Sequence, residues 1–538
     1  MTAAGRHYAT IWEAIADRIP DAPALRHGDR QLPWREFEDR SARLAGAMRA
    51  HGIGPGDGVA AYLYNCPEYF EVFFGALKIR AVPANINYRY GSDELWSLLE
   101  NCEAEVLFFD AALRDKVRSV AERAGGPRLV VEVGSERESP VPSTIAYEAL
   151  LGGNAPAPRI ERDDDDTFLS YTGGTTGLPK GVLFNIGQSL GNSFWFRDLF
   201  VGGEPTSLGP VEFAAEQAER TASLSAIPAS PLMHSTGFIF ASLPTLTAGG
   251  LVTTLVDRSF DAHELLSTVE MTGATVVGIV GDAFALPILR ALDEGTPGGG
   301  RYDTSTLRVM CSAGVAWSAH VKERLLEHIP HMMLLDSCGS TEGVAYGIRQ
   351  VRRGDHVATA NFDAAPGLKV LSPEGVELPP GEVGMLAGPT TASGYYRDPE
   401  RTAATFTDIG GQRYAIPGDF GRIEPDGSVT LLGRGVTTIN TGGEKVYPGE
   451  VEEAIRGLPD VADCLVLGIP DERFGQVVAA LVAPEPGTAL GAEDVSGAVR
   501  SVLAGYKVPR RISFVEQVPR LPNGKADYES ARVLAESS

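Results

Sequence analysis

Cysteine is scarce in this sequence. Only five cysteines occur among 538 residues, and no two of them are spaced as C-x-x-C. This scarcity argues against a disulfide framework and against a zinc site, and it is typical of proteins from a reducing cytoplasm. The N-terminal stretch also lacks the apolar core of a secretory signal, since Glu13 and Asp17 lie where that core would be. We therefore expect a cytoplasmic protein.

The sequence has no excess of basic residues and no unbroken apolar run. The 47 Lys and Arg residues against 70 Asp and Glu residues give a formal net charge of −23. This balance excludes nucleic acid and an anionic membrane surface as expected partners. The segment 221–256 is free of charge except for His234, but prolines, a Gly-Gly pair and many hydroxyl residues interrupt it. A buried helix followed by a buried strand at 251–256 explains it better than a membrane span, so no transmembrane segment is predicted.

The periodicity of apolar residues predicts an α/β fold. Amphipathic helices alternate with short apolar strands over residues 10–150, which indicates a parallel sheet with helices on its faces. Short β segments between Gly/Pro turns begin near residue 366, and a compact α+β pattern follows residue 434. We expect a large N-terminal domain (1–434) of parallel-sheet α/β subdomains plus a small β unit. A small mobile α+β C-terminal domain (437–538) should follow a hinge at 434–437.

A glycine-rich loop, LSYTGGTTGLPKGV at residues 169–182, follows an apolar run. Glycines let backbone N–H groups turn toward an anion, while threonine hydroxyls and a lysine add donors and positive charge. The Walker A pattern is missing, because Leu178 and Pro179 separate Gly177 from the lysine. We predict a polyphosphate site unlike that of P-loop NTPases, with a flexible surface turn as the alternative. Its candidate ligands are Thr172, Gly173, Gly174, Thr175, Thr176, Gly177 and Lys180.

Two further apolar segments end in polar turns, and both are interpreted as strand–helix units. In TLRVMCSAGVAWSAHVKERLLEHIP, the strand should end at Ser312-Ala313-Gly314. In HMMLLDSCGSTEG, the strand should end at Asp336, and a turn carries Ser340, Thr341 and Glu342. Ligands of open parallel sheets bind outside the carboxyl ends of strands, so both turns should border one crevice with the glycine-rich loop.

Five segments in this order resemble the core motifs of the adenylate-forming superfamily. They are YTGGTTGLPKGV, GSTEG, YAIPGDFGRIEPDGSVTLLGR, INTGGEKVYPGEVE and PRLPNGK, and they extend over nearly the whole chain. That superfamily contains acyl- and aryl-CoA synthetases, luciferases and the adenylation domains of peptide synthetases. Two of the motifs are similar to those of actinobacterial acyl-CoA synthetases that activate bulky carboxylates, including steroid and terpenoid acids.

The resemblance implies an ATP-dependent acyl-CoA synthetase, an AMP-forming acid–thiol ligase. ATP would convert a carboxylate to an acyl-adenylate with release of pyrophosphate, and the thiol of coenzyme A would then displace AMP. The small domain would rotate between these steps. The implied ligands are ATP, Mg²⁺, coenzyme A and a small-molecule carboxylate or acyl-adenylate, and a homodimer stays open.

The resemblance also implies roles for individual residues. Thr341 would contact the α-phosphate and Glu342 would bind Mg²⁺, while Asp419 would accept from the ribose hydroxyls with support from Arg434. Lys525 would bridge the carboxylate and the α-phosphate during adenylation. Gly442 and Gly443 would line the tunnel for the thiol of coenzyme A. The remaining expected cofactor contacts are Ser312, Ala313, Gly314, Asp336, Ser337, Cys338, Gly339 and Lys445.

The acyl pocket is expected where small residues leave room for a wide, rigid acid. His234 is a candidate for its wall and for a catalytic role, with a satisfied core histidine as the alternative. The segment 202–225, which contains the helical pattern EFAAEQAER, looks like an insertion beside this pocket that could cover the substrate. The other expected pocket residues are Trp195, Gly237, Phe238, Gly281, Gly314 and Val315.

Two positions depart from the pattern of the superfamily. Cys338 stands where most members carry an aromatic residue that stacks on adenine, and Val436 stands where most carry an Asp or Lys hinge residue. Both departures concern the ATP half-reaction or the domain rotation. The alternative function is therefore a relative that only converts a pre-made acyl-adenylate to acyl-CoA. A P-loop NTPase and a non-catalytic binding protein are less consistent with the motifs.

Overall fold

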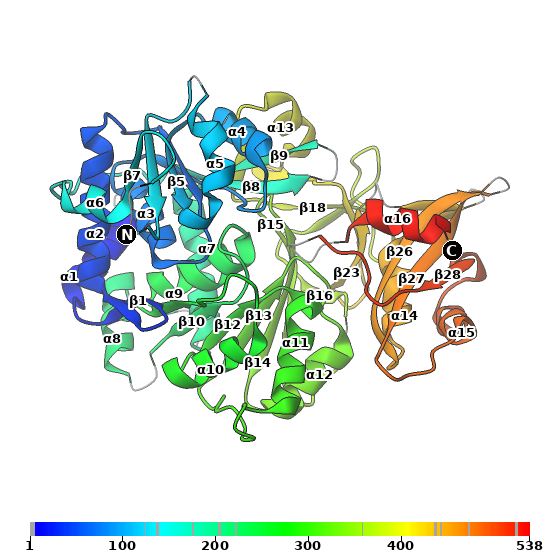
Figure 1. The fold of residues 1–538 in the computed structure, drawn as a ribbon. Coiled ribbons are helices and arrows are strands. Elements are labelled where there is room, and N and C mark those ends of the chain that lie inside the picture. The colour runs from blue at the N-terminus through cyan, green and yellow to red at the C-terminus, as the bar shows by residue number, and fades with distance from the viewer. Residues whose placement is uncertain are drawn as a thin grey trace.

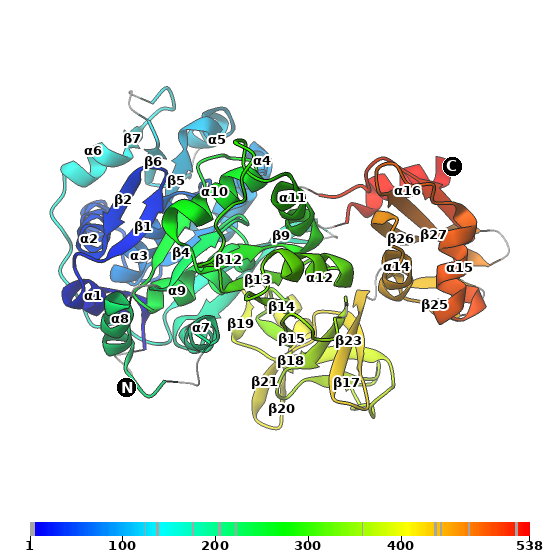
Figure 2. The same ribbon diagram turned by 90° about the horizontal axis from the view of Figure 1, so that it is seen from below.

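The computed structural model describes residues 6–123, 125–135, 139–174, 177–202, 206–220, 223–357, 359–434, 438–441, 444–471, 474–521 and 526–537. These residues form three β-sheets with helices packed on them (Figures 1 and 2). Of the helices in these ranges, none is both long enough and apolar enough to cross a membrane.

The first sheet has the strand order β19-β9-β8-β4-β3-β5-β6-β7. The strands from β8 to β7 pair in parallel, whereas β8, β9 and β19 pair antiparallel. Its strands are β3 (Gly58–Tyr62), β4 (Val82–Asn85), β5 (Ala104–Asp110), β6 (Leu129–Val133), β7 (Thr144–Ala146), β8 (Thr167–Gly174), β9 (Gly177–Asn185) and β19 (Ala392–Tyr395). The helices of this part of the chain are α2 (Trp34–Ala50), α3 (Pro67–Lys78), α4 (Ser92–Asn101), α5 (Arg114–Ala121) and α6 (Tyr147–Gly152), with the 3₁₀ turn η2 (Ala111–Leu113).

The second sheet is longer and changes character along its length. Its parallel part comprises β1 (Pro23–His27), β11 (Leu251–Thr254), β10 (Ser225–Pro228), β12 (Val276–Ile279), β13 (Val309–Ala313) and β14 (Met333–Ser340), and β2 (Arg30–Pro33) pairs antiparallel at its edge. Its antiparallel part comprises β15 (Val344–Val351), β16 (Asn361–Ala364), β17 (Lys369–Leu371), β18 (Gly384–Pro389), β20 (Phe406–Ile409), β21 (Gln412–Ala415), β22 (Asp419–Ile423) and β23 (Ser428–Arg434).

The helices of this part of the chain are α1 (Tyr8–Arg18), α7 (Ile186–Phe200), α8 (Pro210–Glu219), the π-helix η3 (Thr236–Ser242), α9 (Leu243–Thr247), α10 (Ala262–Thr272), α11 (Gly281–Glu294), α12 (Ala319–His328) and α13 (Pro399–Thr405). Segment 221–256 thus contains η3, α9 and β11 as predicted, and also strand β10. These elements are buried except for Ile239 and Phe240 of η3, which are half-buried, and a protein of this size has a core large enough to enclose such uncharged segments.

One of the two expected strand–helix units is wrong. β13 is followed by α12, as predicted, but β14 does not end at Asp336. It continues to Ser340 and turns directly into β15, with which it pairs antiparallel through partners such as Ser337 and Ile348. The turn residues 341–343 therefore lie at the tip of a β-hairpin and not at the start of a helix. The pairing with β15 decides this, because a hairpin partner supplies ladder hydrogen bonds to the residues beyond Asp336.

The third sheet lies at the C-terminal end of the chain and stands apart from the other two in both views (Figures 1 and 2). Its strands are β24 (Ile439–Thr441), β25 (Glu444–Val446), β26 (Val461–Asp471), β27 (Gly475–Pro484) and β28 (Arg511–Phe514). The helices α14 (Pro448–Arg456), α15 (Ala492–Val502) and α16 (Tyr528–Ser537) and the 3₁₀ turn η5 (Gly505–Lys507) accompany it. This is the α+β pattern that the sequence predicts.

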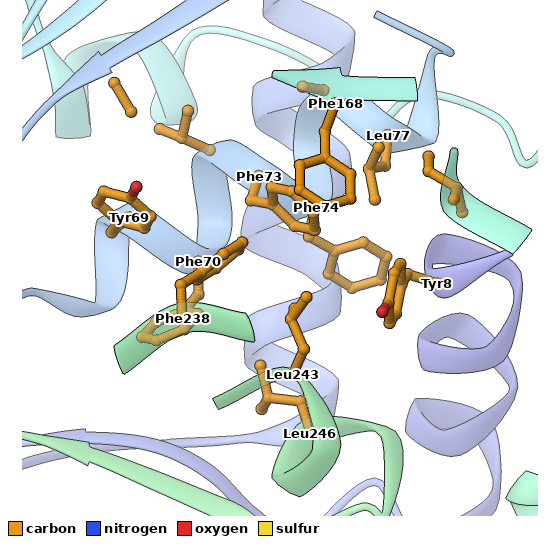
Figure 3. Close-up of a cluster of buried hydrophobic side chains, with 14 of the residues drawn as sticks. Tyr8, Tyr69, Phe70, Phe73, Phe74, Leu77, Phe168, Phe238, Leu243 and Leu246 are labelled. Atoms are coloured by element: carbon orange, nitrogen blue, oxygen red, sulfur yellow. The ribbon is translucent and has the colours of Figure 1, made fainter. Parts of the chain in front are cut away.

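Aromatic side chains of α3 hold the two large sheets together. Phe73 packs edge-on against Phe168 of the first sheet at 5.7 Å and against Phe238 of η3 at 4.8 Å between ring centroids. Phe70 stacks on Phe238, and Phe74 completes the cluster (Figure 3). Burying each such ring contributes about 1.5–3 kcal/mol to folding. The relative placement of the two sheets, and hence of the turns at their strand ends, rests on this core.

The first helix begins with an unusual cap that makes stability depend on pH. The fully buried His7 accepts a hydrogen bond from the Ala9 N–H through Nδ1 at 3.1 Å, and its Nε2 lies 3.5 Å from Asp166 Oδ2. Burial lowers the pKa of His7, although Asp166 opposes this shift. A lowered histidine pKa adds stability that is present above the ordinary value of about 6.5 and is lost as pH falls through the folded-state pKa.

Replacing His7 with Asn should therefore flatten the acid side of the stability profile. Asparagine keeps a side-chain oxygen for the cap but does not titrate. We expect the melting temperature of the wild type to fall more steeply than that of His7→Asn between about pH 6.5 and pH 5. Thermal unfolding at a series of pH values measures this, with the exposed His331 changed to Asn as the matched control. Parallel profiles for the wild type and His7→Asn would contradict the prediction.

Candidate active site

A cavity of about 540 Å³ lies between α7, η3 and the β14–β15 hairpin. This volume is in the range of sites that enclose a small organic ligand. Most of its surface is apolar. Of the predicted site residues, those that line it are Trp195, His234, Ala313, Gly314, Val315, Ser337, Gly339 and Thr341. Segments far apart in the sequence thus meet at one space, as expected for the carboxyl ends of neighbouring strands.

The hairpin tip holds a buried carboxylate that is only half satisfied. Glu342 is 6% exposed, and its Oε1 accepts a hydrogen bond from the Tyr395 hydroxyl at 2.6 Å. Its Oε2 is buried and has no hydrogen-bond partner among the residues that the structure describes. Thr390 Oγ1 donates to the Glu342 carbonyl at 2.5 Å, which holds the turn. A buried, charged oxygen without a partner is costly for folding, so this arrangement indicates a site for a cation or another ligand.

Tyr395 links this carboxylate to the glycine-rich loop. The loop is a hairpin of β8 and β9, with Thr172 opposite Lys180 in the backbone register. The Lys180 ammonium group lies 5.1 Å from the centre of the Tyr395 ring, in a cation–π contact. The pairing of β19 with β9 places Tyr395 beside the strand that carries Lys180. The hydroxyl of the same tyrosine donates its hydrogen bond to Glu342. The predicted loop and the predicted carboxylate therefore share one neighbour, and Thr175 and Thr176 of the loop lie outside the described residues.

Sequence reasoning missed Tyr395. It lies in the segment SGYYRDP, where no spacing or charge pattern points to chemistry. Only the pairing of β19 with β9 brings it to the site, and that contact joins residues more than 200 positions apart. The cavity-lining Thr391 lies just before this segment, and the sequence analysis missed it as well.

The Ser312–Gly314 turn shapes the cavity with its backbone. Ser312 is buried, and its Oγ accepts a hydrogen bond from the Gly281 N–H at 2.8 Å. Gly281 has φ +50°, and a Cβ there would lie 2.4 Å from the Ala316 carbonyl oxygen, so only glycine fits. Gly281 therefore positions the turn and does not line the cavity, whereas Gly314, with φ +92°, faces it.

Strand β14 presents alternate residues to opposite sides. Ser337 and Gly339 line the cavity, while Asp336 and Cys338 point away from it. Asp336 forms a buried ion pair with Lys322 at 2.6 Å, and burial raises its pKa to about 6. Burial, with a further effect of Asp419, raises the pKa of the Cys338 thiol well above its usual value. The Cys338 side chain is thus part of the core. The sequence analysis expected Asp336 and Cys338 to contact a cofactor, but neither side chain lines the cavity.

The remaining predicted nucleotide contacts meet on strands β22 and β23. Asp419 is 9% exposed, and its Oδ2 accepts a hydrogen bond from the Tyr346 hydroxyl at 2.7 Å. Arg434 stands opposite Asp419 in the strand register, and only its backbone is described, as is also true of Lys445. Several predicted residues lie outside the described ranges: Gly442, Gly443, Lys525, and the hinge positions 435–437 with Val436.

The apolar wall of the cavity differs in part from the prediction. Phe238 packs on Tyr69, Phe70 and Phe73 in the core, and it does not line the cavity (Figure 3). Gly237 is also absent from the lining, because its Cα faces the Ser230 carbonyl oxygen, which would lie 2.7 Å from a Cβ. The next residues of the π-helix, Ile239 and Phe240, line the cavity instead, together with Asn192 and Phe196 of α7.

Helix α7 is held against α1 by a face that adjoins its cavity side. Its Ser189 and Ser193 hydroxyls lie 3.0 Å and 2.7 Å from the Tyr8 hydroxyl of α1. Residues 192, 195 and 196, at i, i+3 and i+4 spacing, lie on an adjacent side of the helix and line the cavity. The neighbouring helix α8, from the segment 202–225, packs with Ala214 against Gly249. Its described residues do not line the cavity, so they do not form the cover that the sequence suggested.

The chain was compared with known families and proteins. The family model described as AMP-binding enzyme matches residues 12–396, and the model described as AMP-binding enzyme C-terminal domain matches residues 450–525. This chain belongs to the family of AMP-binding enzymes. The match includes the glycine-rich loop, the hairpin tip and Tyr395, which the structure brings together.

Individual relatives define the class of this AMP-binding enzyme. It is 37% identical to a 3-oxocholest-4-en-26-oate–CoA ligase of Rhodococcus rhodochrous, over 97% of this chain and 95% of the relative. It is 36% identical to a medium/long-chain-fatty-acid–CoA/3-oxocholest-4-en-26-oate–CoA ligase of Mycobacterium marinum, over 98% and 96%. ATP-bound MatB from Rhodopseudomonas palustris matches with a TM-score of 0.79 and 26% identity over 98% of both chains.

These comparisons confirm the predicted family, the α/β fold and the enzyme class. The AMP-binding enzyme is an AMP-forming acyl-CoA synthetase, an acid–thiol ligase, with ATP, coenzyme A and a carboxylic acid as its substrates.

Proposed function

We propose that this acyl-CoA synthetase activates a bulky, largely apolar carboxylic acid, of which steroid side-chain acids are the leading candidates. The observation that carries the proposal is the continuity of the cavity. One cavity is lined both by Thr341 at the hairpin tip and by the apolar side chains Trp195 and Phe240. An acid bound there would have its carboxylate near the proposed phosphate site and its hydrocarbon body among apolar side chains. The names of the two relatives support this substrate class.

The proposed residue roles follow from charge and position. The glycine-rich hairpin with Lys180 would hold the β- and γ-phosphates, and Thr341 would contact the α-phosphate at the point where the acid attacks. Asp419 would accept hydrogen bonds from the ribose hydroxyls, with Arg434 beside it. His234 would form the wall between the acid and the hairpin tip. A carboxylate is a poor acylating agent, so the enzyme would first form the acyl-adenylate and then let the thiol of coenzyme A displace AMP.

Magnesium fits the carboxylate at the hairpin tip. Glu342 Oε2 is a buried oxygen with no partner in the described part of the chain, and a hard oxygen ligand is what Mg²⁺ prefers. The described residues contain no cluster of three or more His, Cys, Asp or Glu side chains suited to a metal. This agrees with the usual Mg²⁺ site, which takes one or two carboxylates and completes its shell with substrate phosphates and water. When bound, the ion would offset the charge that develops on the α-phosphate.

The small C-terminal domain would serve the two steps by rotating about a hinge at 434–437. Lys525 would approach the carboxylate and the α-phosphate for adenylation, and Gly442 and Gly443 would line the thiol tunnel afterwards. A mobile point charge suits a contact that must be made and released once in each cycle. A cytoplasmic location and assembly as a homodimer stay predictions, the latter to be checked by light scattering.

Replacing Lys525 with Ala should separate the two half-reactions. We expect acid-dependent ATP–pyrophosphate exchange to fall by on the order of a hundredfold or more, because a charge that stabilises the transition state is lost. Thioester formation from synthetic acyl-adenylate and coenzyme A should change little. Lys507→Ala, in the same domain, is the control. Equal loss of both half-reactions would refute the assignment of Lys525 to adenylation.

Product analysis tests the proposed function directly. The enzyme is incubated with ATP, Mg²⁺, coenzyme A and a panel of acids from hexanoate to 3-oxocholest-4-en-26-oate, and AMP, pyrophosphate and acyl-CoA are quantified. We expect all three products in equal amounts, with the highest kcat/KM for the bulky acids. A preference for short acids would overturn the substrate class. Thioester from acyl-adenylate without any exchange would instead support the transfer-only relative, which the absence of an aromatic residue at Cys338 favours.

A further inference from the structure

Two asparagines near the ends of neighbouring strands hold the chain segment that leads to His234. This segment, residues 229–234, joins β10 to the π-helix η3 and contains no strand, so its backbone groups need partners elsewhere. Asn65, just beyond β3, accepts a hydrogen bond from the Leu232 N–H at 2.8 Å and donates to two carbonyl oxygens of the same stretch. Asn85, the last residue of β4, donates through Nδ2 to the carbonyl oxygen of Met233, which directly precedes His234.

The amide of Asn85 also holds the strand that enters the glycine-rich hairpin. Asn85 stands opposite Ser170 in the parallel register of β4 and β8, and its Oδ1 accepts a hydrogen bond from the Tyr171 N–H at 2.9 Å. Tyr171 directly precedes Thr172, the first of the predicted phosphate ligands. Because one partner is an N–H group and the other a carbonyl, a single amide satisfies both. One side chain therefore joins the residue before the glycine-rich loop to the residue before His234.

The two partners of this amide belong to different sheets. β8 lies in the first sheet, whereas the segment 229–234 continues from β10 of the second. Packing at this junction is incomplete, since a small cavity of about 20 Å³, with Asn85 and His234 in its lining, has room for about one water molecule. Hydrogen bonds are directional, whereas hydrophobic contacts are not. The amide therefore fixes a spacing that the aromatic core between the sheets defines less sharply.

This spacing matters because each substrate of the adenylation step would contact one of the two segments. In the proposed function, the glycine-rich hairpin would hold the phosphates of ATP, and His234 would form the wall beside the acid. The carboxylate oxygen must approach the α-phosphorus to about 3–3.5 Å and form a bond to it as the bond to pyrophosphate breaks. A misplacement of about 1 Å can reduce the rate of such a step by about a hundredfold.

We propose that Asn85 is a positioning residue of the adenylation step, which holds the acid site and the phosphate site in register through the two hydrogen bonds of one amide. This inference rests on the proposed function and adds to it the link between the two sites. The second half-reaction needs the link less, because a covalent bond already joins the acyl group to the phosphate in the acyl-adenylate. The bound intermediate would re-order a loosened segment, at a cost in KM and not in kcat.

The test compares the two half-reactions within the same protein. The variants are Asn85→Ala, which removes both hydrogen bonds, and Asn85→Asp, which keeps the acceptor for Tyr171 but loses the donor for Met233. Asn361→Ala is the control, because its half-buried amide also links two strands, by donating to Ser428 Oγ at 2.7 Å, but lies outside both segments. The first readout is ATP–pyrophosphate exchange with 3-oxocholest-4-en-26-oate and with dodecanoate. The second is thioester formation from the synthetic adenylates of both acids at saturation.

We expect kcat for exchange to fall by about ten- to a hundredfold in Asn85→Ala. The loss in Asn85→Asp should be at least as large, because its carboxylate oxygen would face the Met233 carbonyl oxygen. KM for ATP and kcat of the thioester step should change little in both variants, and Asn361→Ala should behave as the wild type.

An equal loss in both half-reactions of the Asn85 variants would show a purely structural role and overturn the inference. Undiminished exchange would overturn it as well, and either result leaves the proposed function standing. Absence of exchange with both acids in the wild type overturns adenylation in the proposed function and this inference with it.

Discussion

Changing Glu342 to Gln should abolish most of the adenylation activity without unfolding the enzyme. Glutamine has the same size, and its Oε1 can still accept the hydrogen bond of the Tyr395 hydroxyl at 2.6 Å. The charge that would hold Mg²⁺ is lost, so ATP–pyrophosphate exchange should fall by on the order of a hundredfold or more. The melting temperature should stay the same or rise, because the wild-type Oε2 is buried without a partner in the described structure.

Tyr395→Phe is the matched control for this variant. It removes the hydrogen bond to Glu342 but keeps the carboxylate, so we expect a loss of about tenfold or less. Exchange rates should be measured as a function of Mg²⁺ concentration for both variants. A Glu342→Gln enzyme with normal exchange and normal Mg²⁺ dependence would show that the metal is held elsewhere.

Filling the cavity at Val315 should reverse the substrate preference. Val315 lines the cavity next to Gly314, where φ is +92° and the space around a Cβ is open. Val315→Trp would occupy part of the about 540 Å³ that a wide acid needs. We expect kcat/KM for 3-oxocholest-4-en-26-oate to fall by on the order of a hundredfold, while the value for hexanoate changes little. The measurement is thioester formation with both acids.

Val315→Ala provides the comparison, because it enlarges the cavity by two methyl groups and should leave the bulky acid a good substrate. Affinity for ATP should be the same in both variants, since the nucleotide site is not altered. Undiminished activity of Val315→Trp on the steroid acid would show that the acid does not pass Val315.

Much of the fold could be predicted from the sequence because its signals are local. Helices and strands alternate over residues 10–150 as the periodicity predicts, and the expected α+β pattern follows residue 434. The error at β14 has a different origin. A strand that ends in a polar turn has the same local sequence whether a helix or an antiparallel strand follows, so the long-range partner decides.

The candidate site shows the same division. The residue types of the glycine-rich loop indicate a phosphate site, whereas the metal and ribose roles of the GSTEG turn and Asp419 are implied by the family resemblance and stay proposals. The sequence also indicated a pocket beside His234. It named Gly237 and Phe238 as pocket residues, whereas Ile239 and Phe240 line the cavity, because a π-helix shifts the side-chain positions relative to an ordinary helix.

By itself, the sequence determined the family, the order of the motifs and the chemical types of the groups in the site. The tertiary structure alone decided which groups touch. Tyr395 meets Glu342 across 53 residues through a side-chain hydrogen bond, and the pairing of β19 with β9 brings it to Lys180 across more than 200 residues. The aromatic core around Phe73 sets the two sheets at the distance that leaves a cavity open between them. Such contacts depend on packing between distant segments, and no local pattern of residues encodes them.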